Sequence, residues 1–153
     1  MDELLPRLAG RRVVFTNGCF DLLHVGHLRT LQWARCQGEV LVVGLNSDSS
    51  VRGLKGPLRP LVPQDDRAEM LAGFACVDFV VIFEETDPTR LLAQIRPAVH
   101  VKGGDYQAED LPEGALVKSW GGEVKVTPLI QGRSTSNLQK KIQDEHAAGP
   151  DSR

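Results

Sequence analysis

Short apolar stretches alternate with amphipathic helical patterns along most of the chain. One of them, EVLVVGL at residues 39–45, is almost continuously apolar, which is typical of a strand buried on both faces. Strands are expected at residues 12–16, 39–45, 79–82, 98–102 and 123–126. Helices are expected at residues 26–37, 65–75, 87–95, 111–120 and 135–142, and a loop at 47–63. This alternation predicts an α/β fold with a doubly wound, mostly parallel sheet of five strands in a Rossmann-like arrangement.

Some residues inside these predicted elements are expected to pack rather than to act chemically. The helix at residues 65–75 should turn Met70, Leu71 and Phe74 inward. His100 lies within the fourth predicted strand, so we expect a core histidine with one satisfied ring nitrogen.

The composition suits one domain of this kind and excludes several other classes of protein. The chain has 153 residues, of which 41% are hydrophobic and 25% are charged, as in ordinary globular domains. Its net charge of −2 argues against a general binder of nucleic acids or membrane surfaces. No apolar run approaches the roughly 20 residues of a membrane span, and the start lacks a signal-peptide pattern. We expect a cytoplasmic protein with a single domain over residues 1–142 and a disordered polar tail over 143–153.

The three cysteines, Cys19, Cys36 and Cys76, are widely spaced and form no CxxC pair. They make a poor disulfide framework and a poor zinc site, which favours a reducing compartment. Cys36 and Cys76 fall on apolar helical faces and are expected to be buried, inert thiols. For Cys19, which lies in the first predicted turn, a small lining residue is favoured over a nucleophile.

That first turn, between the first strand and the first long helix, is where doubly wound sheets bind their ligands. Two histidines, His24 and His27, stand three residues apart with a glycine between them. On a first helical turn both imidazoles can face one side, beside free backbone N–H groups and the positive end of the helix dipole. Gly18 and Gly26 allow a phosphate to approach the backbone.

The residues alone leave this turn open to two interpretations. It is either a phosphate site or a helix start with ordinary capping histidines, and it is neither a Walker loop nor a GxGxxG motif. A metal site is disfavoured because no third ligand of the right type stands nearby.

Three other segments are expected at the same edge of the sheet. The loop after the second strand carries Arg52, Lys55 and Arg59, which either contact a triphosphate or form a solvated surface. The hydroxyl-rich start of the last helix either caps that helix or binds an anion. After the fourth strand, Gly103 and Gly104 can admit a base, with Asp105 accepting from an exocyclic amine; a plain turn is the competing interpretation.

The string GCFDLLHVGH at residues 18–27 resembles the signature of the HxGH nucleotidyltransferase superfamily, in its cytidylyltransferase-like branch. The stretch RSTS at residues 133–136 resembles the second signature of that superfamily, a helix start that binds the β- and γ-phosphates. The resemblance implies a Rossmann-like nucleotidyltransferase fold and two histidines that stabilise charge at the α-phosphorus. It also implies a mobile lysine, matched here to Lys55, and a homodimer.

A narrower resemblance covers residues 11–142. The VKGGDY string at 101–106, the LKG…RP loop at 54–60 and the GGEVKV strand at 121–126 are similar to the adenylyltransferase domain of ADP-heptose synthase. This resemblance implies transfer of AMP from ATP to D-glycero-β-D-manno-heptose 1-phosphate by direct in-line attack. Mg²⁺ would be held mainly by the ATP phosphates, with no metal ligand from the chain. No sugar kinase accompanies the domain, so a stand-alone version is expected.

The resemblance assigns candidate site residues by their positions in the motifs. His24, His27 and Lys55 are the expected catalytic residues. The expected nucleotide contacts are Asn17, Gly18, Cys19, Phe20, Gly26, Lys102, Gly103, Asp105, Arg133, Ser134, Thr135 and Ser136. The expected partners are small molecules, ATP and a sugar 1-phosphate. A glycerol-phosphate-type cytidylyltransferase, an FMN adenylyltransferase and a non-catalytic nucleotide-binding regulatory module remain as alternatives.

Overall fold

The computed structural model describes residues 1–104 and 111–127, and within them a single parallel sheet organises the chain. The order of its strands is β3-β2-β1-β4-β5, so the chain begins at the centre and winds outward in both directions. All four neighbouring pairs are parallel, which confirms the predicted doubly wound α/β fold. The strands are β1 (Val13–Gly18), β2 (Val40–Asn46), β3 (Phe79–Phe83), β4 (Val99–Gly103) and β5 (Glu123–Thr127).

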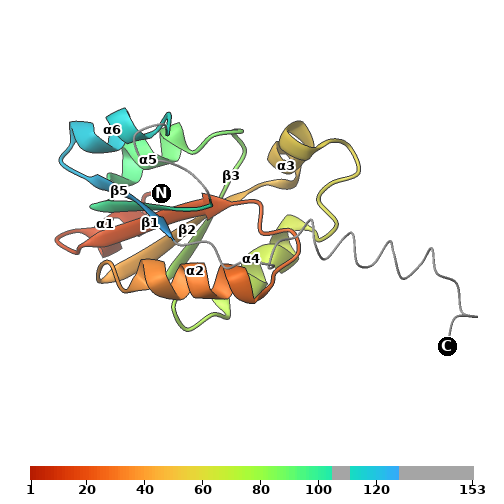
Figure 1. The fold of residues 1–153 in the computed structure, drawn as a ribbon, viewed down its shortest axis with the longest axis horizontal. Helices are drawn as coiled ribbons and strands as arrows, with labels where there is room; N and C mark the ends of the chain where they lie inside the picture. The colour runs from red at the N-terminus through yellow and green to blue at the C-terminus, as the bar shows by residue number, and fades with distance from the viewer. Residues whose placement is uncertain (105–110, 128–153) are drawn as a thin grey trace, which may run out of the picture.

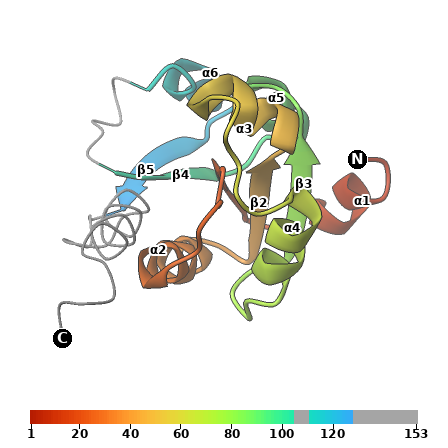
Figure 2. The same cartoon turned by 90° about the vertical axis from the view of Figure 1, so that its right-hand side faces the viewer.

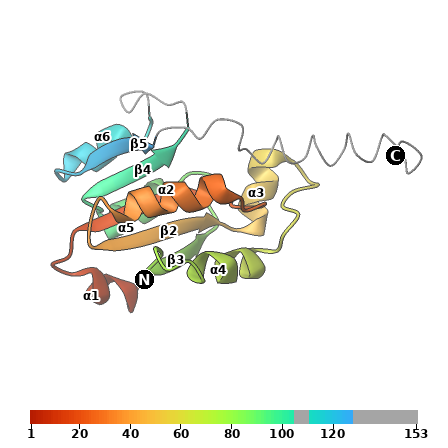
Figure 3. The same ribbon diagram turned by 60° about the horizontal axis from the view of Figure 1, so that its bottom comes forward.

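Helices cover both faces of the sheet (Figures 1 and 2). One face is covered by α2 (Val25–Arg35) and α4 (Gln64–Ala72), and Figure 3 shows α2 lying along the strands. The other face is covered by α5 (Thr89–Ile95) and α6 (Gly114–Ser119). The two other helices are α1 (Leu4–Leu8), which packs against the edge strand β3, and α3 (Asp48–Lys55), which follows β2 directly.

Alternation along each strand divides the core into two layers. Val14 of β1 faces α2 and α4, whereas Phe15 faces α5 and α6. The same alternation runs along β2, where every residue is buried. Burial on both faces explains why β2 is almost continuously apolar in sequence.

The structure corrects the prediction of a loop over residues 47–63. Residues 48–55 form α3, which begins where the Ser47 hydroxyl oxygen accepts a hydrogen bond from the Ser50 backbone N–H at 3.2 Å. The helix is short and mostly polar, with Val51 fully buried, so its composition gave little helical signal. The short helix α1 was not predicted either.

Two expectations of burial are also wrong. Met70 is 56% exposed, whereas its neighbour Leu71 is fully buried, because α4 turns only one side toward the sheet. Cys36 caps the exposed end of α2 and is not a buried thiol, and Cys76 is half-buried. Both cysteines line one surface cavity of about 650 Å³ between α2 and the segment after α4.

The expectations that fall on Asp105, on the RSTS stretch, on the helix at 135–142 and on the tail at 143–153 lie outside the described residues. They remain predictions.

Candidate active site

The turn between β1 and α2 is folded around a buried aromatic ring. Phe20 is 8% exposed and has a φ of 47°, in the left-handed region that non-glycine residues rarely adopt. A Cβ at Gly18 would lie 3.2 Å from Phe20 Cε2, so glycine at this position makes room for the ring. The ring in turn meets His27 edge-on, with centroids 5.4 Å apart. These contacts bring the start of α2 back over the end of β1.

The two histidines cap α2 together. His24 Nδ1 accepts a hydrogen bond from the Gly26 backbone N–H at 3.1 Å, and His27 Nδ1 accepts one from the His24 backbone N–H at 3.3 Å. Their rings are stacked, with centroids 3.9 Å apart. A neutral imidazole that accepts at Nδ1 carries its proton at Nε2. The reciprocal cap therefore gives both rings the same tautomer, with Nε2–H as the donor.

His27 is a neutral donor at physiological pH. Burial, with a smaller contribution from the neighbouring His24, lowers the pKa of His27 from 6.5 to about 4. A neutral ring pair avoids like-charge repulsion at stacking distance. An anion bound at the Nε2 side would favour the charged form of His27 and raise that pKa.

Asp21 ties the turn to the segment that follows α3. Its side chain is 5% exposed, and Oδ1 accepts hydrogen bonds from the backbone N–H groups of Leu61 at 2.7 Å and Val62 at 3.0 Å. Its other oxygen, Oδ2, lies 2.6 Å from Arg59 Nε. Arg59 is thus paired inside the structure and is a weaker candidate for the triphosphate contact that the sequence left open.

Arg67, on α4, links the carboxyl edge of the sheet to α3 and to the segment after α3. The residue is only 1% exposed. Nη1 donates to the backbone oxygens of Cys19 and, at 2.9 Å, Asn46; Nη2 donates to Asp48 Oδ1 at 2.7 Å. Its Nε donates to the Val62 oxygen at 2.9 Å. The end of β1, the end of β2 and the start of α3 therefore share one guanidinium.

Sequence reasoning missed Asp21 and Arg67 as site residues. The sequence offered one signal for Arg67: it lies on the inward side of a predicted helix, and a buried charge needs a partner, so a polar contact could have been expected there.

Lys55 is an exposed basic residue whose charge acts on Cys19 in the turn after β1. Burial raises the pKa of the Cys19 thiol, and among the neighbouring charges that oppose this rise Lys55 has the largest effect, ahead of Arg67. Cys19 is therefore held as a neutral thiol, in keeping with a lining residue rather than a nucleophile. Arg52 is also exposed, on the preceding turn of α3, and its charge is not among those that act on Cys19.

Two predicted nucleotide contacts, Lys102 and Gly103, lie at the end of β4 in different surroundings. Lys102 Nζ lies 2.7 Å from Glu113 Oε1, and their side chains are 18% and 7% exposed. Burial alone would raise the pKa of Glu113, but the hydrogen bond from Lys102 and nearby charges outweigh it and lower the pKa. A nucleotide contact by Lys102 would require it to exchange this partner. Gly103 is exposed, and a Cβ there would lie 3.5 Å from Thr30 Cγ2 and 3.6 Å from Thr127 Oγ1.

Residues 15–146 match the family model described as cytidylyltransferase-like. The chain belongs to the cytidylyltransferase-like family. The resemblance that the GCFDLLHVGH string implied is thereby confirmed. The matched range begins in β1 and includes the histidine pair, the Arg67 contacts and the predicted second signature.

Curated relatives of this cytidylyltransferase-like chain are each named bifunctional protein HldE. The protein from Syntrophotalea carbinolica is 52% identical over 145 residues, which are 95% of this chain and 30% of that protein. Those from Geobacter sulfurreducens and Geotalea uraniireducens are 54% and 56% identical over 133 residues, 87% of this chain and 27% of each protein. The chain therefore spans less than a third of the length of these relatives.

Solved structures share the cytidylyltransferase-like fold of the chain. A lipopolysaccharide core biosynthesis protein from Thermoplasma volcanium superposes with a TM-score of 0.64 at 25% identity, covering 81% of this chain and all of that one. Pantothenate synthetase from Thermus thermophilus superposes with a TM-score of 0.65 over 91% of this chain and 68% of its own. The second pair is only 18% identical, so it supports the fold alone.

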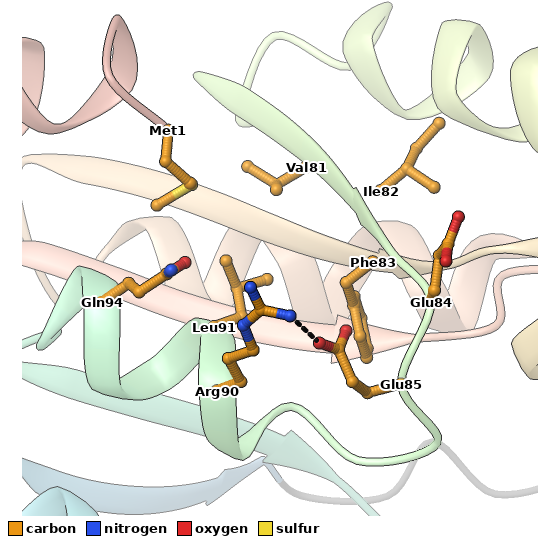
Figure 4. A pocket seen from close by; sticks show the side chains of 9 residues that line it. All are labelled: Met1, Val81, Ile82, Phe83, Glu84, Glu85, Arg90, Leu91 and Gln94. Carbon is orange, nitrogen blue, oxygen red and sulfur yellow. Dashed lines mark hydrogen bonds and ion pairs between the residues drawn. The ribbon is translucent and has the colours of Figure 1, made fainter.

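A separate cavity of about 250 Å³ lies along the edge strand β3 (Figure 4), and neither histidine of the pair lines it. Its polar residues include Arg90, whose Nη1 lies 3.1 Å from Glu85 Oε1. The lining carries three basic or acidic groups, Glu84, Glu85 and Arg90, and no histidine. This cavity therefore lacks the donor set expected of a triphosphate site.

Within residues 1–104 and 111–127, no group of three or more His, Cys, Asp or Glu side chains converges as metal ligands would. No helix in that part of the chain has both the length and the apolar character needed to cross a bilayer.

Proposed function

We propose that the chain transfers AMP from ATP to D-glycero-β-D-manno-heptose 1-phosphate, with ADP-heptose and pyrophosphate as products. The observation that carries this proposal is the stacked His24–His27 pair at the start of α2, in which each ring accepts a hydrogen bond at Nδ1 and carries its proton at Nε2. The heptose acceptor is supported by the similarity to the ADP-heptose synthase domain and by HldE relatives that are at least 52% identical. Because the reaction consumes ATP, we place it in the cytoplasm, and a homodimer is expected.

The proposed reaction needs positioning more than it needs a base. A phosphate oxygen of the acceptor, already ionised at neutral pH, forms a bond to the α-phosphorus. The bond from that phosphorus to the bridging oxygen of the β-phosphate breaks, and pyrophosphate leaves with the electron pair. Negative charge grows on the α-phosphoryl oxygens during this exchange, and preorganised donors stabilise it. Neutral imidazoles can do this without a proton transfer.

The surrounding residues have separate tasks in this scheme. Lys55, exposed at the end of α3, would contact the triphosphate from the α3 side. Arg67 and Asp21 would not touch substrate; they hold the turn and the segment after α3 in register. Such a rigid frame is what a positioning mechanism requires.

The residues present also bear on how Mg²⁺ would be held. Asp21, the carboxylate within the motif, already has two backbone N–H partners and an arginine. A hard cation that needs oxygen ligands would therefore be bound through the ATP phosphates rather than by this turn. Bound there, Mg²⁺ would neutralise part of the triphosphate charge.

A substrate panel tests the proposal. The purified chain is incubated with ATP or CTP and with heptose 1-phosphate, glycerol 3-phosphate or FMN, and pyrophosphate release is measured. We expect the fastest release with ATP and heptose 1-phosphate. A preference for CTP would contradict the proposal. ATP binding with no product from any acceptor would instead support a regulatory module.

A further inference from the structure

Two polar side chains meet on the sheet face opposite α2, near the carboxyl ends of β1 and β4. His100 Nε2 lies 3.3 Å from Asn17 Oδ1. His100 is fully buried, and its ring centroid is 5.5 Å from that of Phe15, on the same face of β1 as Asn17. An apolar side chain would fill the position of His100 at a lower desolvation cost. The polar contact therefore calls for an explanation.

The chemistry of the two groups fixes the direction of this hydrogen bond. An amide oxygen only accepts, so His100 donates through Nε2–H. Its Nδ1 then carries a lone pair, and this buried atom has no hydrogen-bond partner. The reverse arrangement, with a flipped amide and the proton on Nδ1, would bury an unpaired N–H, and such groups are rarer than unpaired acceptors. The contact therefore holds the Asn17 oxygen toward β4.

A carboxamide whose oxygen is held on one side presents its NH₂ group on the other. Asn17 is the penultimate residue of β1, so the residue lies near the edge of the sheet where ligands of this fold bind. Within residues 1–104 and 111–127, this NH₂ group has no hydrogen-bond partner. Lys102, further along β4 on the face of His100, is already paired with Glu113.

On the side of Asn17 away from β4, Gly44 of β2 lies close to its side chain. A Cβ at Gly44 of β2 would lie 2.7 Å from Phe15 Cζ and 3.3 Å from Asn17 Cβ. Because β1 lies between β2 and β4, Asn17 is held by both neighbours. The orientation of the Asn17 amide is therefore set by contacts with its neighbours in the sheet.

We propose that Asn17 donates a hydrogen bond to the phosphate of the acceptor substrate, and that His100 is the positioning residue that aims this donor. The inference rests on the proposed AMP transfer, in which the acceptor enters opposite the leaving pyrophosphate. In the proposed reaction His24 and His27 would hold the triphosphate from the start of α2, on one face of the sheet, whereas Asn17 lies on the opposite face with Phe15 and His100. This assigns Asn17 to the acceptor rather than to the nucleotide.

A matched pair of variants tests the positioning role in steady-state kinetics. His100→Leu removes the donor at similar volume, whereas His100→Gln keeps an N–H at a similar reach. We expect His100→Leu to raise KM for heptose 1-phosphate about tenfold, with KM for ATP changed less than about twofold. His100→Gln should stay within about threefold of wild type for both substrates.

A double mutant shows whether the two residues act as one unit. Asn17→Ala should raise the acceptor KM as much as His100→Leu, and the double variant should be no worse than Asn17→Ala, because coupled residues are not additive. Additive effects, or an unchanged acceptor KM in His100→Leu, would overturn the inference. Thermal unfolding checks the fold; should His100→Leu not fold, His100→Asn, whose amide is too short to reach Asn17, takes its place.

The side-chain amide signal of Asn17 in ¹⁵N NMR separates this inference from the proposed function. Heptose 1-phosphate should shift that signal in wild type and His100→Gln, and the shift should be lost in His100→Leu. A shift without any ADP-sugar product would contradict the proposed function and keep the inference. Product formation with the same Asn17 response in His100→Leu as in wild type would overturn the inference alone.

Discussion

Arg59 Nε lies 2.6 Å from Asp21 Oδ2, with side chains that are 14% and 3% exposed. The pair joins the turn after β1 to the segment after α3, 38 positions later in the sequence (59 − 21). The same carboxylate accepts the backbone N–H groups of Leu61 and Val62. An acidic residue of the nucleotidyltransferase motif thus serves to fix a neighbouring loop.

This relationship predicts unequal effects when either partner is neutralised. Asp21→Asn should lower the free energy of unfolding by about 2–4 kcal/mol, because it leaves a largely buried guanidinium unpaired. Arg59→Gln is the matched change on the other side and should cost about 1 kcal/mol, since Asp21 keeps its two N–H donors. Urea unfolding measures both. Equal losses in the two variants would show that the ion pair does not hold the loop.

Arg67 should tolerate neither a neutral nor a charged replacement. Arg67→Met leaves three backbone oxygens and the Asp48 carboxylate without their donor, and should cost about 3–5 kcal/mol of stability. Arg67→Lys keeps the charge but not the fork of donors, so most of that loss should remain. Chemical denaturation of both variants checks this. Wild-type stability in Arg67→Lys would mean that charge alone suffices.

Lys55 and Arg52 offer a comparison on one helix. Lys55→Ala should raise KM for ATP about tenfold, as expected for loss of a charge-assisted phosphate contact. Arg52→Ala, one turn earlier and also at an exposed position, should change KM by less than about twofold. Initial rates over a range of ATP concentrations give both values. A larger effect at Arg52 would move the triphosphate contact to that residue.

The buried histidines predict how stability depends on pH. The pKa of His27 falls to about 4 and that of His100 to about 3, both through burial above all, from 6.5 in the unfolded chain. Between these values the unfolded chain binds more protons than the folded one, so stability falls as pH drops below about 6.5.

Replacement of either ring should flatten this dependence. His27→Gln and His100→Gln should each reduce the loss of stability between pH 6.5 and pH 4, as measured by urea unfolding at several pH values. A slope in either variant that equals the wild-type slope would show that the ring does not remain neutral in the folded state.

The fold could be predicted from the sequence because its central strands are largely buried on both faces. Burial gives near-continuous apolar runs such as β2, and the alternation with helices then determines the fold class. Helix α3 could not be found in this way, because its stability comes from the Ser47 cap and one buried valine rather than from an apolar stripe.

The candidate site was predictable only where its residues are close in sequence. His24 and His27 could be placed together because three positions make nearly one helical turn. The contacts of Arg67 with Cys19 and Asp48 cross 48 and 19 positions, and no local pattern specifies them. The reciprocal cap of the histidines depends on ring orientation, which spacing does not determine.

The most direct test of the account is the rate of AMP transfer by His27→Ala compared with wild type. Single-turnover transfer of labelled AMP from ATP to heptose 1-phosphate is measured, with ATP binding and thermal unfolding as controls. We predict that ADP-heptose forms in wild type and that the variant is slower by at least about 100-fold, as expected when a transition-state donor is removed. A loss of less than about threefold, with fold and ATP binding intact, would contradict the role of the histidine pair.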